Sequence, residues 1–164
     1  MARLPWLGAP SVTRGLQIRR AQQGDRKQMG ECIFCQIVAG QVPAARLIET
    51  DKVVSFLDIA PVNPGHCLVV PKRHVETLLE MTQQELHVCM FTVQRVARAA
   101  TRAAGAVGFN VLQNNGRCAG QIVPHVHFHV IPRSPDDGFQ FGWRQGSYTK
   151  DELREFERKV RELL

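Results

Sequence analysis

The stretch His125-Val126-His127-Phe128-His129-Val130-Ile131 decides the fold, because histidine alternates in it with apolar or β-branched residues. An alternation of period two predicts a β-strand, since successive side chains point to opposite faces of a sheet. The apolar residues would then enter the core, and His125, His127 and His129 would share the other, solvent-accessible face. Imidazole acts as a nucleophile, proton carrier or metal ligand near neutral pH, so this face predicts a site of chemistry.

Length and charge indicate one domain behind a basic extension. The 164 residues are enough for a single domain with its own core, and the hydrophobic fraction of 44% is ordinary for a globular protein. Residues 1–28 hold six basic residues and one acid, which leaves only +1 of the total net charge of +6 for the remaining chain. The high isoelectric point therefore gives little support to a nucleic-acid partner. We expect residues 1–30 to be the extension and residues 31–164 to be the domain.

Three interpretations of the extension stay open. It is rich in arginine and nearly free of acids, like an organellar transit peptide. Met29 stands just before the first convincing folded segment, so the extension is also consistent with an over-extended start or with a disordered appendage. We expect a cytoplasmic protein, or a mitochondrial one if the extension is a transit peptide. The sequence contains no run of about 18 apolar residues, so we expect no membrane span. Five cysteines, an odd number, argue against a secreted disulfide framework.

Hydrophobic periodicity and turn residues divide the domain into short strands and helices. A short helical turn is expected over residues 32–39, and a long helix between the capping box of Thr82 with Glu85 and the stop at Gly105. A final helix would begin at a second capping box, Thr149 with Glu152. Besides the histidine strand, which should stop at Pro132, strands are expected at residues 46–50, 53–58, 66–71 and 109–113. This order predicts an α+β fold with a mostly antiparallel sheet, one long helix and a C-terminal helix.

The histidine stretch and several further motifs together resemble the histidine triad (HIT) family, in particular its Hint-type branch with a bacterial-type Cys-x-x-Cys pair. The motifs are Cys32-Ile33-Phe34-Cys35, Phe56-Leu57-Asp58-Ile59, Gly65-His66, Pro71-Lys72-Arg73-His74, Asn114-Asn115-Gly116 and Gly120-Gln121. The resemblance implies a homodimer that binds purine nucleotides. It also implies hydrolysis or nucleotidyl transfer at the α-phosphorus of nucleoside phosphoramidates, acyl-nucleotides or dinucleoside polyphosphates.

By this resemblance, histidines perform the reaction. His127 would be the nucleophile and form a nucleotidyl-histidine intermediate, which water then cleaves. His129 would donate hydrogen bonds to the phosphate and help to orient His127, and His66 would support both. Ile122 departs from the family pattern, because the Hint-type branch often has a serine there that could assist the leaving group. A nucleotide-binding scaffold with negligible turnover therefore stays an alternative to the enzyme.

The resemblance also implies a binding site for each part of the nucleotide. Asn114, Gly120 and Gln121 would contact the phosphate, where glycines leave backbone N–H groups accessible to an anion. Asp58 would accept hydrogen bonds from the ribose hydroxyls. The apolar base pocket would be formed by Ile33, Phe34, Ile37, Phe56, Leu57, Ile59 and Leu68.

The Cys-x-x-Cys pair raises a separate question. Cys32 and Cys35 lie one helical turn apart, so both thiols can face the same way. Taken alone, the pair is consistent with two buried small residues, with a redox pair or with metal ligands. The resemblance implies a structural zinc ion held by Cys32, Cys35, His74 and His125, away from the substrate.

Overall fold

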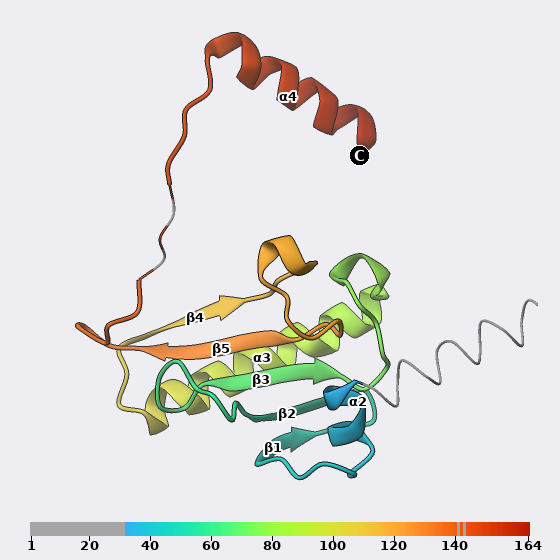
Figure 1. Cartoon of the computed structure of the whole chain (residues 1–164), viewed down its shortest axis with the longest axis vertical. Helices are drawn as coiled ribbons and strands as arrows, with labels where there is room; N and C mark the ends of the chain where they lie inside the picture. The colour runs from blue at the N-terminus through green and yellow to red at the C-terminus, as the bar shows by residue number, and fades with distance from the viewer. Residues whose placement is uncertain (1–31, 141, 143) are drawn as a thin grey trace, which may run out of the picture.

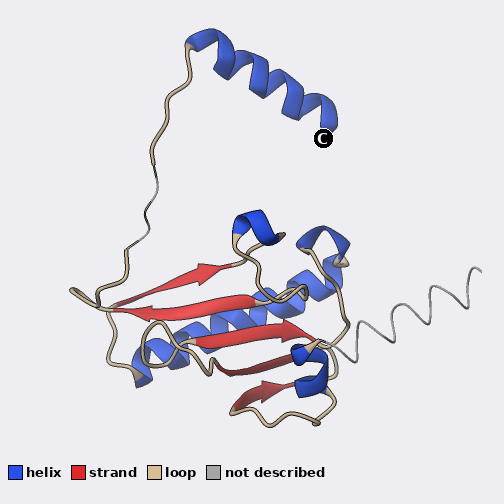
Figure 2. Cartoon of the chain, in the orientation of Figure 1, coloured by secondary structure: helices blue, strands red, loops and turns tan. Residues whose placement is uncertain are grey.

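The computed structural model describes residues 32–140, 142 and 144–164, and the predictions for residues 1–30 lie outside these described residues (Figure 1). The described chain forms one five-stranded sheet with helices on both faces (Figure 2). The strands follow the order β1-β2-β3-β5-β4, and every neighbouring pair is antiparallel. The predicted α+β fold is therefore confirmed. None of the helices described here is both long enough and apolar enough to cross a membrane.

The observed elements lie close to the predicted ones. The strands are β1 (Arg46–Glu49), β2 (Val53–Leu57), β3 (Cys67–Pro71), β4 (Gly108–Leu112) and β5 (Phe128–Arg133). The α-helices are α2 (Ile33–Val38), α3 (Gln83–Ala103) and α4 (Lys150–Leu163), and two short 3-10 helices are η1 (Leu78–Glu80) and η2 (Arg117–Ala119). Both predicted capping boxes are present, at Thr82 with Glu85 and at Thr149 with Glu152.

Two apolar layers separate because successive strand residues point to opposite faces. On one face, α3 packs with Val93 and Val96 against strand residues such as Val69 and Val130. On the other face, the short helix α2 covers β2 and β3. Val126 and Phe128 lie in the α3 layer, so the alternation predicted for the histidine stretch is confirmed.

The bounds of the histidine strand were predicted wrongly at both ends. Strand β5 begins at Phe128, so His125 and His127 precede it. Its pairing with β3 stops at Val69 opposite Phe128. Continuing that register would bring Pro71 opposite Val126, and a proline has no N–H to donate to the ladder. The Val126 N–H instead donates to the Val75 carbonyl oxygen at 2.8 Å.

At its other end, β5 passes through Pro132 rather than stopping there. Pro132 lies opposite Phe109 of β4. Its carbonyl oxygen points away from β4, because it accepts a hydrogen bond from Asn63 Nδ2 at 2.8 Å. The missing N–H lies on that same side, beyond the end of the pairing with β3, so the proline costs the sheet no hydrogen bond.

Candidate functional site

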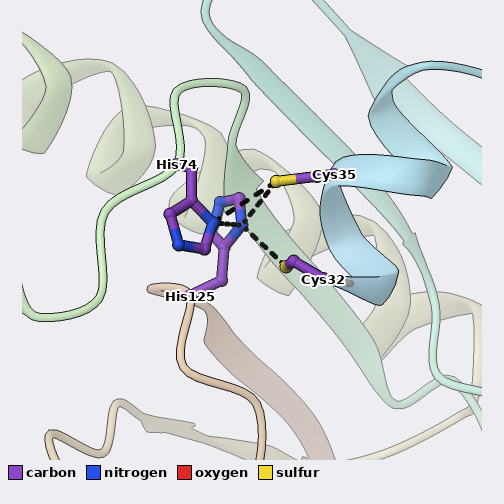
Figure 3. A group of neighbouring side chains, drawn as sticks. All are labelled: Cys32, Cys35, His74 and His125. Carbon is purple, nitrogen blue, oxygen red and sulfur yellow. Dashed lines mark hydrogen bonds between the residues drawn. The ribbon is translucent and has the colours of Figure 1, made fainter. Parts of the chain in front are cut away.

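Two cysteines and two histidines from distant segments meet at His125, the first residue of the histidine stretch (Figure 3). Cys32 and Cys35 come from the start of α2, His74 from the loop after β3, and His125 from the segment before β5. His125 Nδ1 lies 3.4 Å from Cys32 Sγ, 3.6 Å from Cys35 Sγ and 3.2 Å from His74 Nδ1. Cys35 Sγ lies 3.3 Å from His74 Nδ1.

These distances fit a tetrahedral metal centre. A zinc ion with ordinary bond lengths separates a sulfur ligand from a nitrogen ligand by about 3.6 Å and two nitrogen ligands by about 3.3 Å. His125 is also oriented for coordination, because its Nε2–H donates to the Pro71 carbonyl oxygen at 2.9 Å. That bond leaves the Nδ1 lone pair directed at the two thiols, as is usual for the outer partner of a histidine ligand. The four residues could therefore hold a divalent metal ion.

Burial sets the protonation of this cluster. It raises the pKa of Cys35 to about 12, and the neighbouring Cys32 raises it further in the same direction. Burial also lowers the pKa of His125 to about 4. The histidine is therefore a neutral ligand at pH 7, and a bound cation would reverse the effect on the thiol, since coordinating thiols are deprotonated.

His127 occupies the middle of the site, and its ring is shielded. The residue is only 6% exposed. The Phe34 ring packs edge-on against it with ring centroids 5.0 Å apart. The prediction of a solvent-accessible row of imidazoles is therefore wrong for His125 and His127, because α2 covers the segment that precedes β5. His129 keeps partial exposure.

A backbone carbonyl fixes which nitrogen of His127 is free. His127 Nδ1 lies 2.7 Å from the carbonyl oxygen of His125, which can only accept a hydrogen bond. The proton of the neutral ring therefore lies on Nδ1, and the lone pair lies on Nε2. Burial lowers the pKa of His127 below its ordinary value, although the bond to His125 and the charge of Asp58 oppose this effect. The ring is thus neutral at pH 7 with an unprotonated Nε2.

His66 and His129 form a second hydrogen-bonded pair with a defined direction. The backbone N–H of Val62 donates to His66 Nδ1 at 3.2 Å, so the His66 proton lies on Nε2. His66 Nε2 lies 3.0 Å from His129 Nδ1 and 3.6 Å from Asp58 Oδ2. The nitrogen that would have to bind a metal at Asp58, His66 and His129 therefore carries a proton. This second cluster suits hydrogen bonding rather than coordination.

Burial also keeps this second pair neutral. It lowers the pKa of His129 to about 4, with further lowering from His127 and His66. It lowers the pKa of His66 as well, against the opposing charge of Asp58. His129 then accepts on Nδ1 and carries its own proton on Nε2, as a donor beside His127, whose ring centroid is 4.8 Å away.

The predicted phosphate loop is braced from within. Gln121 is buried, and its Oε1 accepts from the Gly116 N–H at 2.6 Å while its Nε2 donates to the Glu76 carbonyl oxygen at 2.7 Å. Gly116 and Gly120 have φ of 81° and 87°, values that residues other than glycine rarely adopt. Gln121 thus shapes the loop, and Asn114, whose Nδ2 lies near Gly120, is partly exposed.

The predicted base-pocket residues divide between two places. Phe34, Ile37, Phe56 and Leu68 lie together in the apolar layer under α2. Ile33 and Ile59 have exposed side chains.

Leu57 does not belong with this group. It lines a groove of 540 Å³ on the α3 face, together with Cys67 and Ala100. Adjacent residues of a strand point to opposite faces, so Phe56 and Leu57 cannot line one pocket. The prediction for Leu57 was therefore wrong. Asp58 follows on the face of Phe56, with its Oδ1 held by the Ala60 N–H at 2.9 Å.

Three groups that orient the histidines were missed by the sequence analysis. They are the carbonyls of Pro71 and His125 and the N–H of Val62. Every residue carries such backbone groups, so no sequence signal marks them. The one available hint is the Asn63-Pro64-Gly65 turn just after Val62, which limits how that loop can run.

Comparisons with known proteins identify relatives in sequence and in structure. Residues 39–136 match the family model described as the HIT domain. An adenosine 5'-monophosphoramidase of Schizosaccharomyces pombe is 42% identical over 124 residues, which cover 75% of this chain and 90% of the yeast protein. A crystal structure of a HIT family member from Bacillus subtilis is 39% identical, with a TM-score of 0.77 over 81% of this chain and 96% of that chain.

A further similar structure contains a metal. It is a zinc-bound histidine triad family protein from Mycobacterium smegmatis, 34% identical, with a TM-score of 0.65 over 82% of this chain and 96% of that chain.

Proposed function

This chain belongs to the HIT family, and on that premise we propose that it is a nucleotide-binding hydrolase acting at the α-phosphorus of purine nucleotides. Nucleoside phosphoramidates are the first expected substrates, because the similar yeast protein is named an adenosine 5'-monophosphoramidase. Acyl-nucleotides and dinucleoside polyphosphates are further candidates. The observation that carries the proposal is the hydrogen bond from His127 Nδ1 to the His125 carbonyl oxygen, which leaves a neutral, unprotonated Nε2.

The proposed reaction has two displacements at His127. The Nε2 lone pair attacks the α-phosphorus, a P–N bond to the ring forms, and the bond to the leaving amine breaks as the amine takes up a proton from the solvent. The Nδ1–H of the resulting imidazolium stays bonded to the His125 carbonyl, which stabilises its positive charge. Water then attacks the phosphorus and gives up one proton to the solvent, the P–N bond to the ring breaks, and AMP leaves with Nε2 unprotonated again.

Neighbouring groups would stabilise the negative charge on the phosphoryl oxygens. His129 is the proposed donor, because its Nδ1 already accepts from His66 and its Nε2 keeps the proton. Asn114 and the backbone N–H groups near Gly120 are the proposed donors from the loop, which Gln121 braces. Donors held in place before the reaction lower the barrier most effectively, since they need no reorganisation.

The nucleoside would lie between α2 and the end of β2. Asp58 is the proposed partner of the ribose hydroxyls, with one carboxylate oxygen held by the Ala60 N–H. The exposed side chains of Ile33 and Ile59 can contact a base directly. The residues beneath them, Phe34 and Phe56, form the floor of this region.

We also propose that Cys32, Cys35, His74 and His125 bind a structural zinc ion. The thiol–imidazole distances fit tetrahedral geometry, and a similar solved structure is a zinc-bound protein. A bound zinc ion would join α2 to the segment before β5, and so hold Phe34 and His125 in place beside His127. It would supply no chemistry to the substrate, because all four ligand positions belong to the protein.

A homodimer is the assembly expected of this site, and strand β4 favours it. β4 is an edge strand with Phe109 and Val111 partly exposed beside α3. An exposed apolar edge strand is a surface that soluble proteins usually cover. We expect Phe109→Lys to convert a dimer to a monomer in size-exclusion chromatography, while Leu47→Lys on the opposite edge strand leaves the size unchanged. A wild-type monomer at micromolar concentration would refute this assembly.

The alternative is a nucleotide-binding protein without turnover, and one observation favours it. His127 is 6% exposed, so access to Nε2 requires an opening beside a shielded ring. Incubation with adenosine phosphoramidate separates the two functions, because the enzyme releases AMP and the scaffold only binds. We expect AMP release by the wild type and none by His127→Ala, with AMP binding kept in both.

The matched control is His87→Ala. His87 lies exposed on α3 and, apart from His127 itself, is the one histidine outside both clusters. It should release AMP at the wild-type rate. Equal AMP release by His127→Ala and the wild type would refute the proposed nucleophile, and AMP binding with no release by the wild type would favour the scaffold.

A further inference from the structure

The loop between β2 and β3 is anchored to the far end of β5 by a single side chain. Asn63 Nδ2 donates to the Pro132 carbonyl oxygen and to Asp137 Oδ2, both at 2.8 Å. Asp137 is itself held by two hydrogen bonds from the Arg133 guanidinium, at 2.6 and 2.8 Å. Arg133 and the backbone N–H groups of Ser134 and Phe139 also keep the pKa of Asp137 well below its usual value, so it stays an acceptor.

The residue before this anchor touches the site. The Val62 N–H donates to His66 Nδ1, and the loop is closed on itself by the His66 N–H, which donates to the Asn63 carbonyl oxygen at 3.0 Å. The position of the Val62 N–H therefore depends on where Asn63 is held. A donor at Nδ1 places the His66 proton on Nε2.

The tautomer of His66 determines the tautomer of His129. With its proton on Nε2, His66 donates to His129 Nδ1 at 3.0 Å, and His129 must then carry its own proton on Nε2. If the Val62 N–H moved away, the Asp58 carboxylate 3.6 Å from Nε2 would still favour the Nε2 proton, but nothing at Nδ1 would exclude the other tautomer of His66. With the proton on Nδ1, His66 would accept from His129 instead, and His129 would lose the Nε2 proton that faces the substrate.

We propose that Asn63 is a positioning residue: by anchoring the loop to Pro132 and Asp137, it holds the Val62 N–H on His66 and so fixes His129 as an Nε2–H donor. The importance of that donor for AMP release rests on the proposed function, but the ring tautomers do not. They can be measured on the free protein without any nucleotide.

The test uses ¹⁵N NMR of the histidine rings of the full chain at pH 7, where shifts distinguish protonated from unprotonated nitrogens. The wild type should show unprotonated Nδ1 and protonated Nε2 in both His66 and His129. Asn63→Asp keeps the shape of the side chain but replaces the donor by a carboxylate that repels Asp137. We expect it to admit the other tautomer of His129, with a change in the tautomer ratio of about fivefold, as for the loss of one ordinary hydrogen bond.

The matched control is Asn110→Asp. It introduces the same charge beside the same arginine, because Asn110 Oδ1 already accepts a hydrogen bond from Arg133, and an aspartate keeps that acceptor. Its ring tautomers should equal those of the wild type. A wild-type His129 protonated on Nδ1, or Asn63→Asp with wild-type tautomers, would overturn the proposal. The wild-type measurement can overturn the proposal even if the variant does not fold.

The same samples separate this proposal from the proposed function. If AMP is released, Asn63→Asp should slow its release by at most about fivefold, in proportion to the lost Nε2–H tautomer, and Asn110→Asp should not slow it. Absent AMP release with the expected wild-type tautomers would refute the proposed function alone. AMP release by a wild type whose His66 and His129 rings exchange freely between tautomers would refute the role of Asn63 alone.

Discussion

Replacing Phe34 by leucine should change both effects that burial has on His127, access to the ring and the pKa of the ring. The Phe34 side chain is 7% exposed, and its ring lies 5.0 Å from His127 and 5.9 Å from His125 between ring centroids. The ring shields the His127 side chain from the solvent, and so it also excludes the water that would stabilise a protonated imidazole. A smaller side chain should therefore admit the substrate more easily and raise the pKa of His127 toward its ordinary value.

The size of the effect follows from these contacts. Exchange of Phe34 for the somewhat smaller leucine costs up to about 1.5 kcal/mol, and the lost ring contacts add about 0.5–1.5 kcal/mol, so Phe34→Leu should destabilise the fold by about 1–3 kcal/mol. Burial is the largest cause that lowers the pKa of His127. The acid limb of kcat/KM reports the free enzyme, so it should lie below pH 6.5 in the wild type and move upward in the variant.

The assay is the pH dependence of AMP release from adenosine phosphoramidate, with urea denaturation of the same samples. Val54→Ala is the control, because Val54 is fully buried in the same apolar layer and its truncation costs about 2 kcal/mol. It should lose similar stability without moving the acid limb. An unmoved acid limb in a folded Phe34→Leu protein, or an equal movement in Val54→Ala, would refute the link between shielding and protonation.

Further predictions concern stability, metal and leaving group. The pKa of His129 is lowered by burial to about 4, so its contribution to the free energy of unfolding is complete above pH 6.5 and is lost as the pH falls. Between pH 7 and pH 5 the loss from His129 is roughly 2 kcal/mol, and His125, whose pKa is lowered equally, adds to it. Urea denaturation should therefore show a loss of at least roughly 2 kcal/mol, and a constant value over that window would contradict the burial argument. Cys35→Ser should lower both bound zinc and the melting temperature, whereas the exposed Cys118→Ser should change neither; a zinc-free wild type of unchanged stability would exclude the metal site. Ile122→Ser should raise the rate of AMP release if the missing hydroxyl limits the leaving step; the side chain is 92% exposed, so stability should change by less than about 0.5 kcal/mol, and an unchanged rate would dispose of the hydroxyl argument.

Much of the fold could be predicted because local rules and tertiary packing agree. The two capping boxes marked the starts of α3 and α4, and alternation placed Val126 and Phe128 in the core. The rules failed where a neighbouring strand mattered. Pro71 ended the pairing that would have extended β5 backward, and Pro132 was tolerated because β3 had already ended beside it. Neither fact can be read from the local sequence around the histidines.

The candidate site was predictable in its residues but not in its orientation. The four metal-ligand candidates predicted from the sequence are the four that lie together in the structure, although their burial was not predicted. It failed for Leu57, because the strand alternation that placed the histidines was not applied to Phe56 and Leu57. The tautomers depend on backbone groups and on Asn63, whose partners are about 70 residues away along the chain. The compartment, and the nature of residues 1–30, stay predictions.

The central claim is that His127 Nε2 becomes covalently bonded to the nucleotide. The most direct measurement is mass spectrometry of wild-type protein mixed with adenosine phosphoramidate and stopped within one turnover by alkaline denaturation, followed by digestion. The account predicts an AMP adduct on the peptide that carries His127, which is absent from the His127→Ala protein. AMP release by the wild type with no adduct, or with an adduct on another residue, would contradict it.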